Sequence, residues 1–143
     1  MRNTQTISET LFIPLLYRAI ETQRTDAMIK DEKAVELVKQ LSSDGPIRYD
    51  SDWIKQAPMA ELNKVMRIML TREMDRYVRD FLSRHPQGIV VHIGCGLDSR
   101  FDRVDNDQVE WYDLDLPEVI ELRRKLLGDQ GPALSGVEEG RYH

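Results

Sequence analysis

The sequence has few of the features that define several large classes of protein. Cys95 is its only cysteine, so an internal disulfide is impossible, and this is consistent with a reducing compartment. No apolar run approaches the ~18 residues that a membrane-spanning helix needs. The N-terminal stretch has neither the continuous apolar core nor the cleavage site of a signal peptide. We therefore expect a cytoplasmic protein with no membrane partner.

Basic charge is also scarce. The net charge is −5 and no basic stripe stands out, which argues against a nucleic-acid partner. Apolar residues make up 41% of the chain and charged residues 31%, proportions that are typical of a soluble globular domain. We predict no metal site.

Hydrophobic periodicity predicts helices in the first part of the chain. Apolar residues recur at helical spacing in residues 5–24, in residues 31–41, and from Pro58 to about Arg84. A turn-rich segment, residues 42–52, connects the second of these helices to the third. The third carries one continuous apolar stripe, which consists of Leu62, Met66, Leu70, Met74, Tyr77 and Phe81.

The pattern changes after residue 86. The short, β-branched run "GIVVHI", residues 88–93, predicts a buried strand, and "VEWYDLD", residues 109–115, predicts a second strand. Pro117 then opens a helix that ends at Gly128. The order of strand, glycine turn, short helix or loop, strand and helix predicts an α/β fold with a parallel sheet, preceded by a helical N-terminal region over residues 1–86.

Two glycines follow the first predicted strand in "GCGLDS", residues 94–99. At the carboxyl end of such a strand the chain turns sharply, and a ligand can bind against the turn. Gly94 and Gly96 permit positive φ and remove a Cβ that would hold a ligand away from the backbone. A dinucleotide fingerprint has a third glycine where this chain has Ser99, which disfavours NAD or FAD. Alternatively, both glycines serve only a tight turn.

Asp115 lies 19 residues after Gly96, at the end of the second predicted strand. An acid at this distance from a glycine turn can accept hydrogen bonds from the ribose hydroxyls of a nucleoside. S-adenosylmethionine carries such a ribose but no pyrophosphate, so it does not need the full dinucleotide turn. Asp115 could instead, or in addition, be the N-cap of the helix that opens at Pro117.

Other polar residues near the turn have simpler interpretations. His92 alternates with apolar neighbours and is predicted to pack in the core. Cys95 is predicted to be a small buried side chain under the ligand rather than a reactive thiol. Asp98 and Arg100 either pair with each other or bind ligand. The charged run "ELRRK", residues 121–125, predicts a solvated helix face.

Two long segments resemble a known family. "VVHIGCGLDSRFDRVDN" and "VEWYDLDLPEVIELRRKLL" are similar to the leucine carboxyl methyltransferase family, and most similar to its bacterial O-methyltransferases of the tetracenomycin polyketide-synthesis type. The resemblance covers nearly the whole chain and includes "DRYVRDFLSRHPQG". It implies a class I methyltransferase with a Rossmann-like, seven-stranded, mostly parallel sheet that uses S-adenosylmethionine. Residues 87–143 would then begin the cofactor-binding domain.

The resemblance also implies roles for individual residues. Gly94, Gly96, Asp98 and Asp115 match the family's cofactor site, with Arg100 in the same signature. Arg72 is the nearest match to a family arginine that binds the methionine carboxylate. By helical spacing, however, Arg72 faces away from the apolar stripe, so the alternative is a solvated arginine.

The expected function is S-adenosylmethionine-dependent O-methylation of a carboxylate or hydroxyl on a small molecule. The sequence indicates no residue as catalytic. Because "VEEGRYH" resembles the entrance to a third strand, we expect the chain to be the N-terminal half of the enzyme. The alternative is an inert fragment that only self-associates or binds cofactor. A homo-oligomer is expected, because the apolar stripe and the strand edges need cover.

Overall fold

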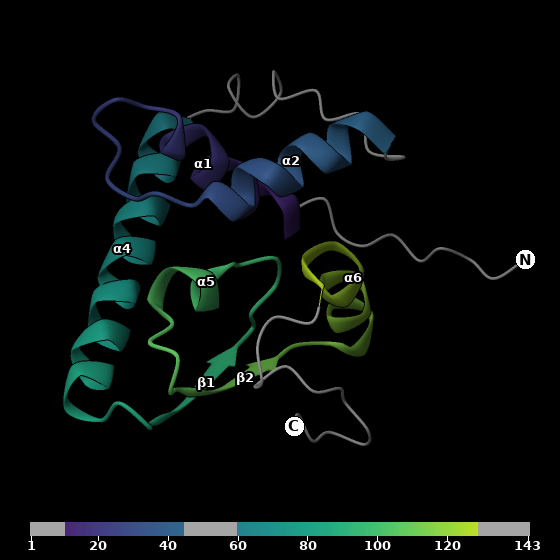
Figure 1. Ribbon diagram of the computed structural model, residues 1–143. Helices are drawn as coiled ribbons and strands as arrows, with labels where there is room; N and C mark the ends of the chain where they lie inside the picture. Colours follow the sequence, from purple (N-terminus) through teal and green to yellow (C-terminus); the bar gives the residue numbers. More distant parts are fainter. Residues whose placement is uncertain (1–10, 45–59, 129–143) are drawn as a thin grey trace, which may run out of the picture.

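The computed structural model of the protein describes residues 11–44 and 60–128, and within them helices and strands alternate as expected for an α/β fold. The start of the first predicted helix, most of the connection at residues 42–52, and "VEEGRYH" lie outside the described residues. The described elements, which Figure 1 labels, are α1 (Phe12–Thr22), α2 (Glu32–Asp44), α4 (Ala60–Arg84), β1 (Ile89–Ile93), α5 (Arg100–Val104), β2 (Glu110–Leu114) and α6 (Pro117–Leu127).

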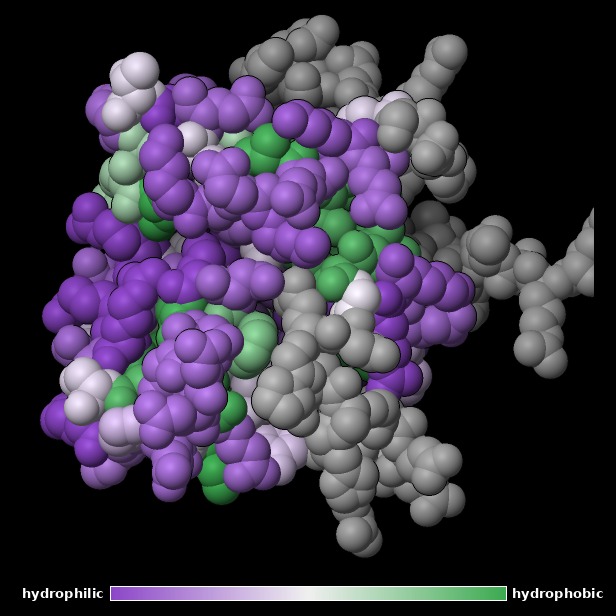
Figure 2. All heavy atoms as spheres, viewed as in Figure 1, coloured by the Kyte–Doolittle hydropathy of each residue, from purple (hydrophilic) through white to green (hydrophobic). Residues whose placement is uncertain are grey.

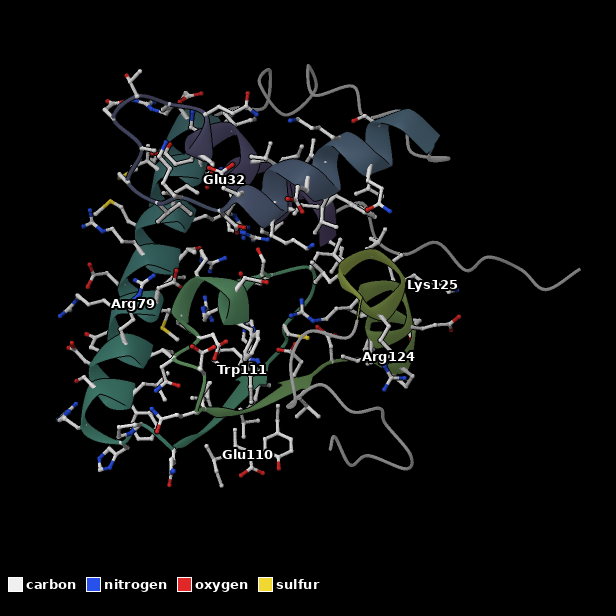
Figure 3. All side chains as sticks on the ribbon, viewed as in Figure 1. Glu32, Arg79, Glu110, Trp111, Arg124 and Lys125 are labelled. Carbon is white, nitrogen blue, oxygen red and sulfur yellow. The ribbon has the colours of Figure 1, made fainter. Side chains whose placement is uncertain are left out.

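The two strands pair in parallel, so the presence of both strands and the α/β fold class are confirmed. Ile89 lies opposite Glu110, and Ile93 lies opposite Leu114. Helices α4, α5 and α6 lie on the same side of this sheet (Figure 1). Trp111 points from β2 toward these helices, whereas Glu110 points to the opposite side (Figure 3). A parallel connection of this kind needs a crossover, and the segment that contains α5 supplies it.

The sheet is covered on one face only, among the described parts of the chain. Ile89, Val91 and Ile93 share a face and are between 54% and 75% exposed. Val90 and His92 point the other way, toward the helices, and are half-buried. The prediction of a buried strand is therefore wrong for this face, because α4, α5 and α6 all lie on the other side of the sheet.

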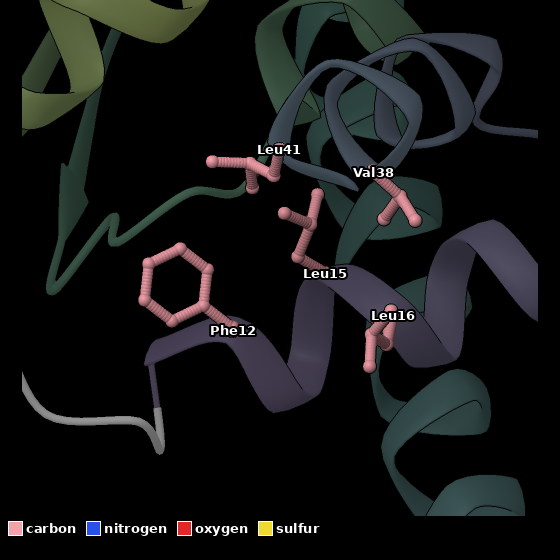
Figure 4. Close-up of a pocket in the computed structure, with 5 residues that line it drawn as sticks. All are labelled: Phe12, Leu15, Leu16, Val38 and Leu41. Atoms are coloured by element: carbon pink, nitrogen blue, oxygen red, sulfur yellow. The ribbon is translucent and has the colours of Figure 1, made fainter. Parts of the chain in front are cut away.

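The N-terminal helices pack against each other and against the α/β part. Their shared core includes Phe12, Leu15 and Leu37, and it extends to Leu97 after β1 and Leu127 on α6. Hydrophobic residues are visible between α2 and α6 in Figure 2. A cavity of about 10 Å³ remains between α1 and α2, and its lining is entirely apolar (Figure 4), so it is a packing gap rather than a ligand site.

Helix α4 buries the face opposite its continuous apolar stripe. Ile68 and Leu82 are buried, and Asp75 lies between them on the same face. Except for the half-buried Phe81, the stripe is exposed, with values from 42% to 64% for Leu62, Met66, Leu70, Met74 and Tyr77. The N-terminal helices thus leave the stripe uncovered. Across residues 11–44 and 60–128, no helix has both the length and the hydropathy required for a membrane span.

The orientation of α4 predicts unequal effects for two similar substitutions. Ile68→Ala should lower the free energy of unfolding by about 2–5 kcal/mol, because it empties a site that is 1% exposed. In the 143-residue chain, diluted until it is monomeric, Leu70→Ala should change it by less than about 0.5 kcal/mol, because Leu70 is 64% exposed there. Urea denaturation measures both values. Equal losses, or a larger loss for Leu70→Ala, would contradict this orientation.

Candidate functional site

The glycine turn has the backbone geometry that the sequence predicted. Gly94 has φ +65° and Gly96 has φ +49°, in the left-handed region that residues other than glycine rarely adopt. A Cβ built on Gly94 would have no neighbouring atom within 4 Å, whereas one on Gly96 would lie 3.2 Å from Leu11 Cδ1. Open space for a ligand therefore lies beside Gly94, and Gly96 is also needed for packing against Leu11.

Asp115 and the glycine turn meet at the carboxyl ends of the two strands. The Gly96 amide donates a 2.8 Å hydrogen bond to Asp115 Oδ2, and the Leu116 amide donates one of 2.8 Å to Oδ1. The N-cap of α6 is Leu116, without a side-chain cap, so the capping interpretation of Asp115 is wrong. The half-buried carboxylate instead ties the end of β2 to the turn that follows β1.

Two further hydrogen bonds anchor the turn, and Cys95 is a buried residue within it. The amide of Gly94 donates to the carbonyl of Leu114 at 2.7 Å, and the amide of Asp98 donates to the carbonyl of Cys95 at 2.9 Å. Burial raises the pKa of the Cys95 thiol to about 12, so the thiol stays protonated at neutral pH. This supports the interpretation of Cys95 as a buried packing residue rather than a reactive nucleophile.

Asp98 faces arginine side chains. Its Oδ1 lies 2.9 Å from Arg103 Nη1, and its Oδ2 lies 3.2 Å from Arg100 Nη2. Burial alone would raise the pKa of Asp98, but the charges of Arg18, Arg103 and Arg100 hold that pKa well below its usual range. Of the two alternatives for Asp98 and Arg100, the structure shows pairing. Cofactor binding by Asp98 stays a prediction.

Arg72 lies on the exposed surface of α4. Its side chain is 48% exposed, and its Nη2 lies 3.6 Å from Glu73 Oε1. No hydrogen bond or ion pair within the described parts of the chain joins it to the glycine turn. The structure therefore brings Gly94, Gly96 and Asp115 together but not Arg72, whose role as a carboxylate ligand stays a prediction.

Asp98 belongs to a buried network of charged residues that the sequence patterns did not indicate. Asp75 on α4 binds two arginines of α5. Arg103 contacts it through Nε at 2.6 Å and Nη2 at 3.0 Å, and Arg100 Nε donates to it at 3.0 Å. Burial alone would lower the pKa of Arg103, but the hydrogen bond to Asp75 and the nearby carboxylates raise it. These ion pairs fix α5 against α4.

Asp31 connects the N-terminal helices to the same network. Its Oδ1 accepts the Ala34 amide at 2.9 Å, as an N-cap of α2 does, and Ser99 Oγ donates to it at 2.7 Å. Its Oδ2 lies 2.9 Å from Arg18 Nε and 2.7 Å from Arg103 Nη1. One buried carboxylate thus joins α1, α2, α5 and the residue that follows Asp98.

Asp113 forms the other end of the network. Trp111 Nε1 and Arg123 Nε each donate to it at 2.9 Å, and His92 Nδ1 donates at 3.2 Å. Burial alone would raise the pKa of Asp113, but the His92 hydrogen bond, the Arg123 charge and the Trp111 hydrogen bond lower it. His92 also packs edge-on against Trp111 with 5.8 Å between ring centroids, in agreement with its predicted place in the core.

Arg123 lies in the run predicted to be a solvated face, and for this residue that prediction is wrong. Its side chain is 4% exposed and reaches from α6 to the carbonyl oxygens of Gly96 at 3.2 Å and Asp98 at 2.6 Å. Arg124 and Lys125 do point outward, as predicted (Figure 3). Arg123 falls in phase with the buried Ile120 and Leu127, and this spacing is the signal that could have revealed it.

An open groove of about 430 Å³ lies near the amino ends of the two strands, away from the glycine turn. Ligands of open α/β sheets bind at the carboxyl ends, so this groove is not the candidate site. No group of three or more potential metal ligands occurs in residues 11–44 and 60–128. The groove is lined by Arg79, Leu82, Ser83, Pro86, Arg103, Val104, Asp105, Asn106 and Gln108.

Known proteins similar to this chain are methyltransferases. The chain is 38% identical over 123 residues to the tetracenomycin polyketide synthesis O-methyltransferase TcmP of Streptomyces glaucescens, an alignment that covers 84% of this chain and 42% of that protein. It is 26% identical over 137 residues to the S-adenosyl-L-methionine-dependent methyltransferase dpfgK of Gibberella zeae, covering 94% and 44%. The chain thus spans less than half the length of these relatives. No solved structure shows significant similarity to it.

The leucine carboxyl methyltransferase family matches residues 12–140, which include all the described elements and the glycine turn. The resemblance carried by the turn and by the segment around Asp115 is therefore confirmed. The chain belongs to the leucine carboxyl methyltransferase family.

Proposed function

We propose that the glycine turn and Asp115 bind S-adenosylmethionine, and that the protein is an O-methyltransferase that acts on a small molecule. The observation that carries the proposal is the 2.8 Å hydrogen bond between the Gly96 amide and Asp115, two residues that are 19 positions apart. It brings a carboxylate to the glycine turn at the carboxyl ends of parallel strands, which is the arrangement that binds the ribose of a nucleoside.

The residues of the turn fit the cofactor chemically. Gly94 leaves open space beside the backbone, and Asp115 is half-buried at the edge of that turn. A carboxylate accepts hydrogen bonds from hydroxyl groups as well as from amides, so Asp115 is chemically suited to the ribose hydroxyls. When bound, S-adenosylmethionine supplies a methyl group on a positively charged sulfur. This chain would bind and orient the nucleoside, a contribution of positioning rather than of acid or base chemistry.

The proposed acceptor is a carboxylate or hydroxyl oxygen of a small molecule. Support for an oxygen acceptor comes from the name of the Streptomyces glaucescens relative, an O-methyltransferase of polyketide synthesis. Support for the cofactor comes from the name of the Gibberella zeae relative. The acceptor is therefore proposed to be of the polyketide type, and no residue among those described is assigned as a catalytic base.

The role of Asp115 can be tested by calorimetric titration of the full-length protein with S-adenosylmethionine. Asp115→Asn should weaken binding by about 1–3 kcal/mol, because a charged acceptor is lost. Glu118→Gln is the matched control, since Glu118 is exposed on the first turn of α6 and should leave the affinity unchanged. No binding by the wild-type protein would refute the proposed cofactor. Equal affinities for wild type and Asp115→Asn would refute the role of Asp115.

We further propose that the exposed apolar surfaces bind other polypeptide, which in the full-length protein is the remainder of the methyltransferase fold. These surfaces are the stripe on α4 and the uncovered face of β1. Apolar patches of this kind tend to associate, and within residues 11–44 and 60–128 each strand of the sheet has one edge that no other strand pairs with. The 143 residues alone should then form homo-oligomers.

Sedimentation velocity of the isolated 143-residue chain at micromolar concentration tests this association. The chain should sediment as oligomers, and Leu70→Lys should shift it toward monomer because it places a charge within the stripe. Glu121→Gln, an equal change of charge at an exposed position on α6, should not. A sharp wild-type monomer with cooperative melting would show that the described helices suffice to close the core.

A further inference from the structure

Three consecutive carbonyl groups of the glycine turn are held by two buried arginines. Arg123 Nη1 donates to the carbonyl oxygens of Gly96 and Asp98, at 3.2 Å and 2.6 Å. Arg18 Nη2 donates to the carbonyl oxygen of Leu97, at 2.8 Å. The two guanidinium groups come from α6 and α1, so the turn is held from both the C-terminal and the N-terminal parts of the described chain.

Each guanidinium group is itself fixed by a buried carboxylate. Arg123 Nε binds Asp113 at 2.9 Å, and Arg18 Nε binds Asp31 at 2.9 Å. A guanidinium group is a planar fork, so fixing its Nε side also directs the remaining N–H groups. Trp111 Nε1 in turn donates to Asp113 at 2.9 Å. Both arginines therefore reach the turn in a defined orientation.

Gly96 is held on both sides of its own backbone. Its amide donates to Asp115, and its carbonyl accepts from Arg123. Because a peptide unit is planar and trans, fixing the three carbonyl oxygens also fixes the directions of the amides that follow them. The turn must keep Gly94 and Gly96 at positive φ, a conformation that a flexible glycine-rich segment leaves readily.

We propose that Arg123 and Arg18 are positioning residues for the cofactor turn. They hold residues 94–98 in the conformation that binds the nucleoside, without contacting the ligand themselves. This inference rests on the proposed function for its ligand, but the conformation of the turn can be measured without any ligand. A lysine at position 123 would keep the positive charge beside Asp113 but lose the fork that reaches two carbonyl groups.

The test compares Arg123→Lys with Arg124→Lys in the full-length protein. Arg124 is the exposed neighbour on α6 (Figure 3) and is the matched control. Two quantities are measured: the dissociation constant for S-adenosylmethionine by calorimetry, and amide hydrogen exchange of the peptide that covers residues 94–99 by mass spectrometry. Arg123→Lys should weaken binding roughly ten- to hundredfold. It should also speed exchange in this peptide while β1 and β2 keep wild-type exchange. Arg124→Lys should change neither.

A merely structural role for Arg123 would speed exchange throughout the α/β part rather than in the turn alone, and that result would overturn the proposal. The proposal would also be overturned if Arg123→Lys bound S-adenosylmethionine with wild-type affinity although exchange in the turn was faster. Arg18→Lys is the second variant if Arg123→Lys does not fold, and failure of both to fold would assign the arginines to overall stability. If wild type binds no S-adenosylmethionine, the proposed function is wrong, and unchanged exchange in the turn would then separately refute the positioning role.

Discussion

The structure depends on the pairing of arginines with aspartates that are buried or half-buried. A buried charge is tolerated only when it is paired and hydrogen-bonded, because the lost hydration costs several kcal/mol per ion. Here the two signs balance: four arginines, Arg18, Arg100, Arg103 and Arg123, meet four aspartates, Asp31, Asp75, Asp98 and Asp113. The partners come from α1, α4, α5, β2 and α6 and from the segments that precede α2 and follow β1. Each charge therefore constrains where another element can lie.

This network gives the glycine turn two different sides. On one side, Arg18 and Arg123 bind its carbonyl groups. On the other, Gly94 leaves open space and Asp115 offers a carboxylate. The first side consists of buried charges that neutralise one another, so it holds the backbone in place. The second side is accessible, and it is where we propose that the nucleoside binds. Asp98, which the resemblance predicted to belong to the cofactor site, faces arginines on the first side.

The sequence predicted those features that depend on neighbouring residues. The β-branched run between Gly88 and Gly94 predicted β1, the run "VEWYDLD" predicted β2, and Pro117 and Gly128 marked the two ends of α6. Spacing along the chain cannot show which distant residues pair, and so it did not reveal the contact between Asp31 and Arg103, which are 72 positions apart. It also did not show which face of α4 is buried, because the continuous stripe was more apolar than the face that packs. Asp75 is seven residues from both Ile68 and Leu82, and this helical spacing could have predicted that all three residues share the buried face.

A double-mutant cycle between Asp75 and Arg103 tests most directly whether the buried ion pairs join the helical region to the turn. The unfolding free energies of Asp75→Asn, Arg103→Gln and the double variant of the full-length protein would be measured by urea denaturation. The bidentate contact, at 2.6 Å and 3.0 Å, predicts a coupling energy of at least about 1 kcal/mol between the two positions, within the range for residues in one salt-bridge network. Effects that add to within about 0.5 kcal/mol would contradict it.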